Sequence, residues 1–280
     1  MRGHAADHGA CRKARGAGVT DTARARAWWL FVRFAQREVT NRFAGSLLGG
    51  VWALVHPVAL LVIYTFVFTT VFKVRAVGDG TTPFVVFLAL ALWPWMAFSE
   101  AVMRASASVV ANGALVKKIP FAHELVVYAA VAASFAVQLA GYVLVLVVVA
   151  AGGHALHAAG LPLVLFALAA LAALATGLGL LLGAVHVFVR DLEQGLGHAL
   201  MLLFYLSPIL YSAAMLPEWL QGVMLLNPVA VLLEAARAAL LQGRALPGGA
   251  ELLAGAFCLA AFFAGRLVFR RLSPHFEEAL

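Results

Sequence analysis

Two long stretches of this chain contain no Asp, Glu, Lys or Arg, and they limit the fold more than any other feature. The first runs from Phe43 to Phe72 and the second from Leu125 to Val189. A helix needs about 20 apolar residues to cross a bilayer, so the first stretch holds one crossing and the second holds two. The whole chain is 64% hydrophobic and only 12% charged. A water-soluble fold could not bury this much apolar surface, so soluble enzymes and nucleic-acid-binding proteins are excluded.

The other apolar runs complete an all-α membrane protein with six transmembrane helices. Glycine and proline between residues 152 and 162 divide the second long stretch into two spans, and the fifth span passes through Pro208. The length of the runs, with the charged residues and Gly or Pro at their ends, sets the bounds. The predicted spans are 51–72, 84–104, 125–151, 162–189, 196–213 and 250–269.

The basic residues orient these spans. Nine of the twenty Lys and Arg residues precede residue 43. With both termini on one side of the membrane, sixteen of the twenty lie on that side and four on the other. Cytoplasmic segments carry the excess of Lys and Arg, so we expect both termini in the cytoplasm (N-in, C-in).

The segment before the first span has two parts. Residues 1–27 are basic, and we expect a flexible cytoplasmic tail. Residues 28–44 predict an amphipathic interface helix that lies at the membrane surface, with apolar side chains along one face and polar side chains opposite. Arg42 does not fit this pattern. The apolar face comprises Trp28, Phe31, Val32, Ala35, Val39 and Phe43.

The spans contain few groups that could do chemistry. The only acidic residue well inside a span is Glu100, and Arg104 follows one helical turn later, so we expect a structural ion pair. Ion-coupled carriers need ionisable groups near the bilayer midplane, which disfavours that class. The sequence contains no metal-ligand or hydrolase motif and no Gly-x-x-x-x-Gly-Lys-Ser/Thr loop. We expect no cofactor on this chain, and energy for uphill transport has to come from a partner.

Several ordered segments resemble type 2 ABC-transporter permeases, and among them the exporters of O-antigen, capsule and teichoic acid polysaccharides. The first two follow the interface helix and enter the first span. The others lie in the second span, in the connection after it, in the fifth span, and in the connection that follows the fifth span. The resemblance covers roughly residues 28 to 280, and its segments are 42–49, 51–57, 92–95, 98–101, 112–121, 206–211 and 226–229.

The resemblance implies two permease copies and two cytoplasmic P-loop ATPase subunits, which bind ATP and Mg²⁺. A lipid-linked glycan moves between the permeases of a bacterial cytoplasmic (inner) membrane, and this chain does no covalent chemistry. The resemblance also implies a re-entrant gate in the connection 214–249. A segment that re-enters the membrane and is surrounded by protein can be as apolar as this connection. A coupling helix is expected at 115–124, and the coupling residues are Lys117, Lys118, Ile119, Pro120, Phe121, His123 and Glu124, with a second contact at Arg190 and Asp191.

Aromatic side chains are the candidates for the glycan path. Sugars present apolar C–H faces, and a conduit should bind them weakly at many points. The resemblance places the first and fifth spans beside the channel. The candidates on these spans are Tyr64, Phe68, Phe72, Phe204, Tyr205 and Tyr211.

Other functions remain open at this stage. A type 2 ABC permease for a drug, haem or another lipid would share these features, and altered drug tolerance in a deletion strain would identify it. A membrane scaffold that recruits partners through its basic N-terminus would lose its role without residues 1–27.

Overall fold

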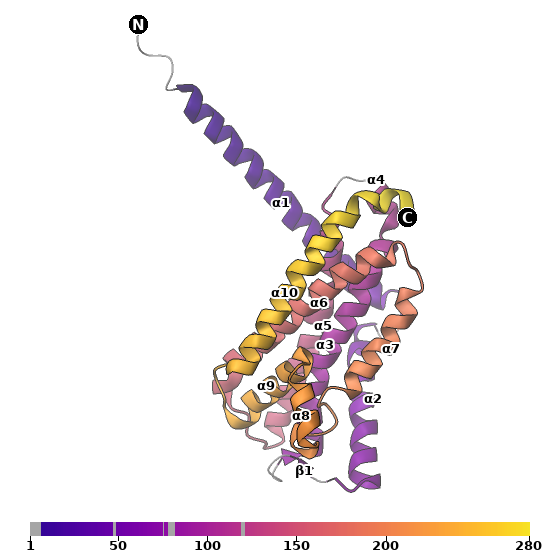
Figure 1. Cartoon of the computed structure of the whole chain (residues 1–280), viewed down its shortest axis with the longest axis vertical. Helices are drawn as coiled ribbons and strands as arrows, with labels where there is room; N and C mark the ends of the chain where they lie inside the picture. Colours follow the sequence, from indigo (N-terminus) through magenta and orange to yellow (C-terminus); the bar gives the residue numbers. More distant parts are fainter. Residues whose placement is uncertain (1–6, 47–48, 75, 78–81, 119–120) are drawn as a thin grey trace.

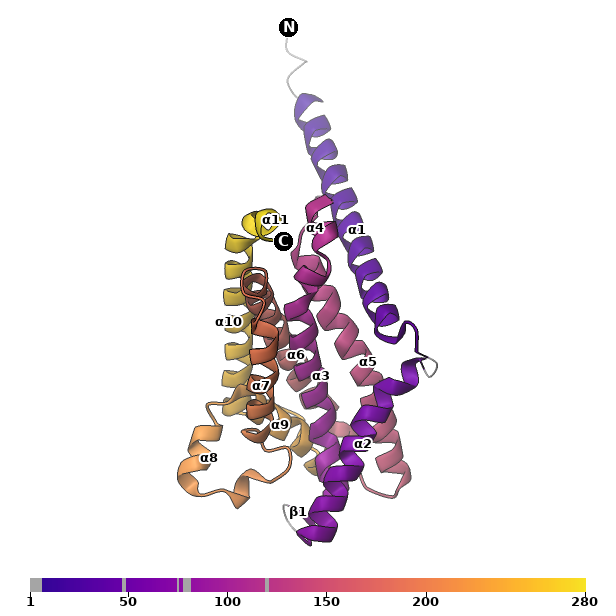
Figure 2. The same ribbon diagram turned by 90° about the vertical axis from the view of Figure 1, so that its right-hand side faces the viewer.

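The protein is a bundle of long helices that run along one axis (Figure 1). The computed structural model describes residues 7–46, 49–74, 76–77, 82–118 and 121–280. Among these residues the only strands are β1 (Ala76–Val77) and β2 (Thr82–Pro83), which form one short antiparallel pair. The fold is therefore nearly all-helical. Helix α1 and the last described helix, α11 (Phe276–Ala279), lie at the same end of the bundle (Figure 2).

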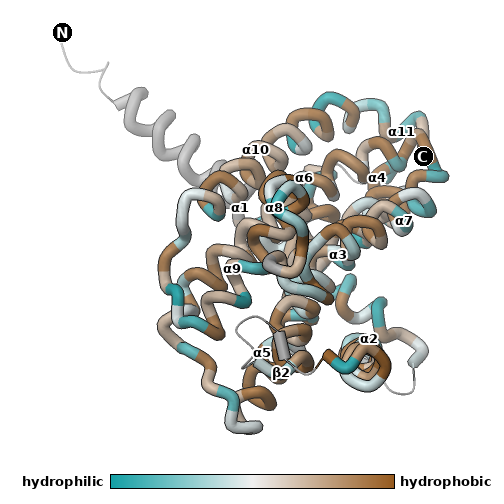
Figure 3. The backbone as a smooth tube through the Cα atoms, turned by 60° about the horizontal axis from the view of Figure 1, so that its bottom comes forward, coloured by the Kyte–Doolittle hydropathy of each residue, from teal (hydrophilic) through white to brown (hydrophobic). Residues whose placement is uncertain are grey.

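Five helical segments of the described chain are long and apolar enough to cross a bilayer. The first combines a 3-10 turn, helix α2 (Trp52–Phe66) and a π-helical turn. The others are α3, α5, α6 with its preceding 3-10 turn, and α10 with the short helices after it. Apolar residues make up most of these helices, and hydrophilic residues gather at their ends, as near α11 (Figure 3). Their bounds are Gly49–Val71, Phe84–Ala111, Glu124–Ala151, Ala158–His186 and Gly249–Ala279.

The predicted fifth span, 196–213, is not one continuous helix. Helix α7 covers only Leu192–Tyr205 and has 14 residues. At about 1.5 Å per residue this helix is about 21 Å long, shorter than the hydrocarbon core of about 30 Å. The chain turns after it because Pro208 has no amide hydrogen to continue the helix. The side chain of Ser207 donates instead to the Leu203 carbonyl, at 2.8 Å.

Two further helices follow this turn. Helix α8 (Glu218–Met224) and helix α9 (Pro228–Gln242) pass the length and composition test only as a pair, and they are bent by 97°. Counting the pair gives up to six candidate spans. The re-entrant placement of this segment and the orientation of the termini stay predictions.

Helix α3 forms the centre of the bundle. It packs against α5, α6 and α9, and most of its residues are buried. Helix α6 approaches it closely because Gly179 has no side chain, and a Cβ there would lie 2.5 Å from the Cβ of Ala105. Small residues allow this spacing between membrane helices. The packing of its buried face against these helices therefore holds α3 in a fixed position in the bundle.

Helix α1 (Asp7–Phe43) is continuous and packs along α5. It begins at Asp7, before the interface helix expected from residue 28. In the expected apolar stripe Phe31, Val32 and Ala35 are half-buried, whereas Trp28 is 66% exposed. An exposed Trp beside basic residues is typical of a membrane surface.

Helix α2 is the most exposed of the long apolar helices. Pro57 is its only buried residue among those described. Its main contact is with α3, and its outward side chains are large and apolar, among them Val58, Val62 and Phe66. Lipid or another protein surface has to cover this side, because exposing so large an apolar surface to water is energetically unfavourable.

Candidate functional site

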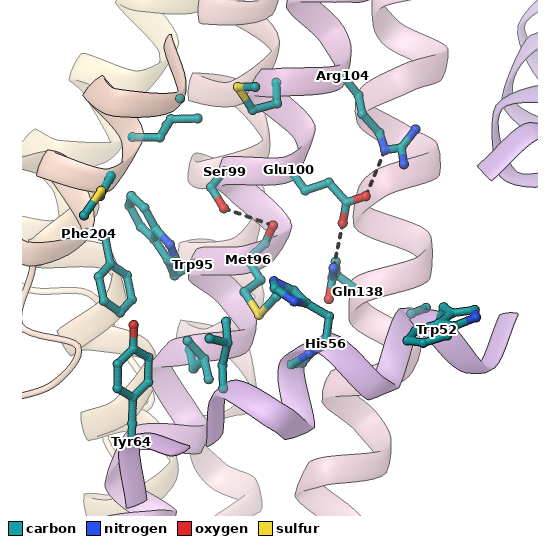
Figure 4. Close-up of a pocket in the computed structure, with 18 of the residues that line it drawn as sticks. Trp52, His56, Tyr64, Trp95, Met96, Ser99, Glu100, Arg104, Gln138 and Phe204 are labelled. Atoms are coloured by element: carbon teal, nitrogen blue, oxygen red, sulfur yellow. Dashed lines mark hydrogen bonds and ion pairs between the residues drawn. The ribbon is translucent and has the colours of Figure 1, made fainter. Parts of the chain in front are cut away.

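A cavity of about 740 Å³ lies between α2, α3 and α7 (Figure 4). Residues of α3 between 92 and 104 line one wall of the cavity, and Gln138 of α5 also lines it. One side stays open, because Met201 and Tyr205 on α7 are 59% and 49% exposed. The cavity is thus open to the outside along α7.

Aromatic rings form one end of this cavity. Tyr64 on α2 stacks on Phe204 on α7 with ring centroids 6.0 Å apart, and Trp95 on α3 lies 5.7 Å from Phe204. The close-up shows Phe204 between the other two rings (Figure 4). Tyr205 also lines the cavity. Aromatic faces of this kind offer flat apolar surface with few hydrogen-bonding groups.

Charged side chains form the other end. Glu100 accepts from Arg104 at 2.9 Å and lies 2.6 Å from the guanidinium of Arg42. Gln138 donates to the same carboxylate at 2.6 Å, and Arg104 also reaches Glu38 at 3.1 Å. Glu100 and Arg104 therefore form the expected pair, within a larger network. Because the network joins α1, α3 and α5, it ties the helix before the first span to the centre of the bundle.

The contribution of α1 to this network was missed from the sequence. Phe34, Glu38 and Arg42 recur every four residues, so they follow one face of the helix. That face contacts α3 through Glu38 and Arg42. The ring centroid of Phe34 lies 5.4 Å from that of Phe121, in the connection between α4 and α5. The signal was Arg42, which did not fit the amphipathic pattern of residues 28–44. A charge on the inward face of a helix predicts a partner of opposite charge.

Three of the proposed path residues do not line the cavity. Phe68 stacks on Phe84 at 4.9 Å, outside the cavity, and Phe72 is 65% exposed. Tyr211 follows the end of α7, and its hydroxyl donates to the carbonyl of Tyr205 at 2.8 Å. The structure thus brings Tyr64, Phe204 and Tyr205 to the cavity, whereas Phe68, Phe72 and Tyr211 are not among the residues that line it.

The proposed coupling residues lie at the end of the bundle that carries α4 (Gly113–Lys118). Lys117, Lys118, Arg190 and Asp191 are exposed. Ile119 and Pro120 lie outside the described residues. In the ranges that the structure covers, no ion pair includes Lys117, Lys118 or Arg190. These cations are free to meet an acidic surface.

Two other coupling candidates face inward instead. Glu124 is 8% exposed, and its carboxylate pairs with Arg266 and Arg270 of α10 at 3.2 and 2.5 Å. It therefore joins α5 to α10. His123 is half-buried between the rings of Phe121 and Phe276. Burial lowers the pKa of His123, and the nearby Glu277 only partly opposes this effect.

The region between α7 and α9 is held by a buried arginine. Arg237 is 2% exposed, donates to the Pro208 carbonyl at 2.7 Å and lies over the ring of Phe87 at 3.5 Å. Arg237 also pairs with Glu234, three residues earlier on the same helix, at 2.9 Å. Asn227 caps α9 and also donates to Ser207 at 3.2 Å. Two of the resembling segments, 206–211 and 226–229, therefore meet in space.

Comparison with known proteins assigns the family. The sequence profile described as "ABC-2 type transporter" matches residues 30–241. The chain belongs to the ABC-2 transporter family. In this ABC-2 transporter the match includes the whole cavity and the charged network at its end.

The relatives of this ABC-2 chain are named as export permeases. It is 27% identical over 204 residues to the O-antigen export system permease protein RfbA of Klebsiella pneumoniae, covering 72% of this chain and 76% of the relative. A protein of the same name from Myxococcus xanthus is 27% identical over 258 residues, covering 90% and 95%. The polysialic acid transport protein KpsM of Escherichia coli is 25% identical over 234 residues, covering 84% and 90%. All three relatives are named as transport or export proteins.

Proposed function

We propose that this chain is the transmembrane subunit of an ATP-driven exporter that moves a lipid-linked polysaccharide outward across the bacterial cytoplasmic membrane. The substrate is an O-antigen or a capsule chain. The chain performs no covalent chemistry. Family membership and the names of the relatives support the permease role.

The observation that carries the proposal is the aromatic end of the cavity. The rings of Tyr64, Trp95 and Phe204 form a continuous wall in a cavity of about 740 Å³. Sugar rings can slide over such faces, because each contact is apolar and none is a strong hydrogen bond. A polymer of varied sugars needs many weak contacts of this kind rather than one selective site.

The open side of the cavity supports a homodimer. The exposed faces of Met201 and Tyr205 leave the cavity without a wall on one side. A second copy of the chain, placed across this open side, would cover it, and the cavities of the two copies would join into one conduit. Polysaccharide would then pass between the two copies.

The energy for export is proposed to come from two partner ATPases. The sequence has no P-loop, so ATP and Mg²⁺ bind on the partners and not on this chain. The exposed cations at α4 and at the connection after α6 suit an acidic partner surface. We propose that ATP-driven closure of the partners moves the segment 115–124 and opens the conduit. With both termini in the cytoplasm, this segment faces the ATPases.

The experiment is complementation of a strain that lacks the chain. Deletion should remove the polysaccharide from the cell surface and leave lipid-linked glycan inside the cell. Wild-type chain restores export, whereas Tyr64→Ala and Tyr205→Ala restore it poorly because each removes a ring that lines the cavity. Phe72→Ala removes an aromatic ring outside the cavity and serves as the matched control.

Three outcomes would contradict the proposal. Normal surface glycan in the deletion strain, with altered drug or haem tolerance, would assign another ABC substrate. Equal export by Tyr205→Ala and Phe72→Ala at equal protein levels would remove the cavity from the path. Loss of function on deletion of residues 1–27 alone would favour a scaffold.

A further inference from the structure

Helix α3 contains a proline in the part of the helix that lines the cavity. Pro94 lies between Trp93 and Trp95, in one of the segments that resemble type 2 ABC-transporter permeases. Proline has no amide hydrogen, so the carbonyl four residues earlier, that of Leu90, loses its partner within the helix. Leu90 is 0% exposed, and no water can reach it. A neighbouring helix has to supply the missing donor, because an unpaired buried carbonyl is unfavourable.

The hydroxyl of Tyr142 on α5 takes the place of the missing amide. It donates to the Leu90 carbonyl at 3.1 Å, and Tyr142 is buried at 3% exposure. The two helices can come this close because Gly141 has no side chain, and a Cβ there would lie 2.7 Å from Nε1 of Trp93. Two consecutive residues of α5 thus fit the proline-containing turn of α3, one through its missing side chain and the other through its hydroxyl.

The residue that follows this proline belongs to the aromatic end of the cavity. Trp95 lines the cavity, and its ring centroid lies 5.7 Å from that of Phe204 on α7 (Figure 4). Phe204 in turn stacks on Tyr64 of α2. Trp95 therefore connects α3 to the two helices on the other sides of the cavity.

The direction of the Trp95 ring depends on the backbone at Pro94. A proline ring displaces the carbonyl of the preceding turn and so changes the course of a helix at that point. The hydrogen bond from Tyr142 fixes that displaced carbonyl against α5. A side chain in a binding site keeps its orientation only when such outer contacts hold its backbone and its rotamer.

We propose that Tyr142 is a positioning residue for the glycan path. Its hydroxyl pairs the carbonyl that Pro94 leaves free, holds this turn of α3 against α5, and thereby directs the Trp95 ring into the cavity. The inference rests on the proposed function, because that function makes the aromatic end of the cavity the path. It adds to the path a residue that does not line the cavity itself.

The first test is a double-mutant cycle, measured by reversible unfolding of the purified full-length chain in mixed micelles. Tyr142→Phe removes only the hydroxyl and should lower the folded-to-unfolded ratio about tenfold, because the Leu90 carbonyl is then buried without a partner. Pro94→Ala restores an amide hydrogen that can donate to this carbonyl. In that background Tyr142→Phe should change the ratio less than about twofold. An equal loss in both backgrounds would overturn the proposal, because the hydroxyl would then not serve the freed carbonyl.

The second test follows the Trp95 ring by fluorine NMR of the chain labelled with 5-fluorotryptophan. The Trp95 resonance is identified by its absence from the variant Trp95→Phe. Tyr142→Phe should shift this resonance and leave that of Trp219, which is 72% exposed on α8, in place. Tyr128→Phe removes another hydroxyl of α5, which donates to Glu124 at 2.9 Å outside the cavity, and should shift neither. An unmoved Trp95 resonance in Tyr142→Phe would overturn the proposal.

The third test is export in the deletion strain, normalised to the amount of folded chain in the membrane. Tyr142→Phe should reduce surface polysaccharide several-fold, and Tyr128→Phe should export as wild type does. Pro94→Ala should also reduce export although its chain is folded, which a role in stability alone would not produce. If Tyr142→Phe exports normally while Tyr64→Ala does not, the inference is overturned and the proposed function stands. If Tyr64→Ala also exports normally, the cavity is not the path and both fall.

Discussion

Glu100 stabilises the junction between α1 and the bundle because two cations share its carboxylate. Arg42 approaches to 2.6 Å and Arg104 to 2.9 Å. The substitution Glu100→Gln keeps the size of the side chain and removes its charge. Within the described chain Arg42 has no other acidic partner, whereas Arg104 keeps Glu38 at 3.1 Å. The loss therefore falls mainly on the contact between α1 and α3.

The size of the effect follows from burial and charge. A hydrogen bond to a charged group contributes about 1.5–3 kcal/mol, and breaking a fully buried pair costs about 3–5 kcal/mol. The side chains of Arg42 and Glu100 are 13% and 20% exposed, so water screens part of the loss. We expect Glu100→Gln to lower the free energy of unfolding by about 2 kcal/mol, a factor of about 30 in the folded-to-unfolded ratio.

The assay is reversible unfolding of the purified chain in mixed micelles, run as a double-mutant cycle with Arg42→Gln. Residues in direct contact should show a coupling energy of about 1–2 kcal/mol. Glu38→Gln removes a more exposed contact, at 27% exposure, and should cost less than about 1 kcal/mol. Equal costs for the two carboxylates, with a coupling energy near zero, would refute the reasoning.

Three further predictions concern other parts of the fold. Gly160→Ala places a methyl group on the Ala239 carbonyl and should lower the free energy of unfolding by about 3 kcal/mol, while Gly222→Ala, in open space, should not. Asn227→Ala removes the cap of α9 and should cost about 1 kcal/mol in the same assay, whereas Asn227→Asp should keep most of it. Because burial lowers the pKa of His123, the unfolded state binds its proton more readily, and stability falls as the pH drops below the usual value of about 6.5. His123→Gln should make that loss shallower, and an unchanged pH profile would show that His123 does not contribute.

Hydropathy predicted the long helices because their lengths are set by the bilayer. The apolar runs place four of the predicted spans on α3, α5, α6 and α10, which are long and apolar enough to cross a bilayer, and the first span on α2 with its flanking turns. The prediction of one continuous helix over 196–213 was wrong, because composition does not show where a helix ends. Residues 206–213 are apolar enough to extend α7, but Pro208 and the side chain of Ser207 end it first.

The cavity was only partly predictable. Tyr64 and Phe204 were chosen for their residue type and span, and whether a ring faces inward depends on how α2 and α7 rotate against α3. Phe72 has the same residue type but is exposed. Glu124 is the opposite case, a residue that the sequence predicts to be exposed and that the structure buries. In the sequence it ends a basic, exposed loop, and only the packing of α10 shows that Arg266 and Arg270 hold it.

The loose attachment of α2 has a consequence for work with the purified protein. One wall of the cavity is a helix with a single buried residue among those described, so its tilt depends on what surrounds it. Hydrophobic helices tilt when the acyl chains around them become shorter. We therefore expect cavity width to vary with acyl-chain length, and reconstitution in short-chain and long-chain lipids should give different transport rates from the same preparation.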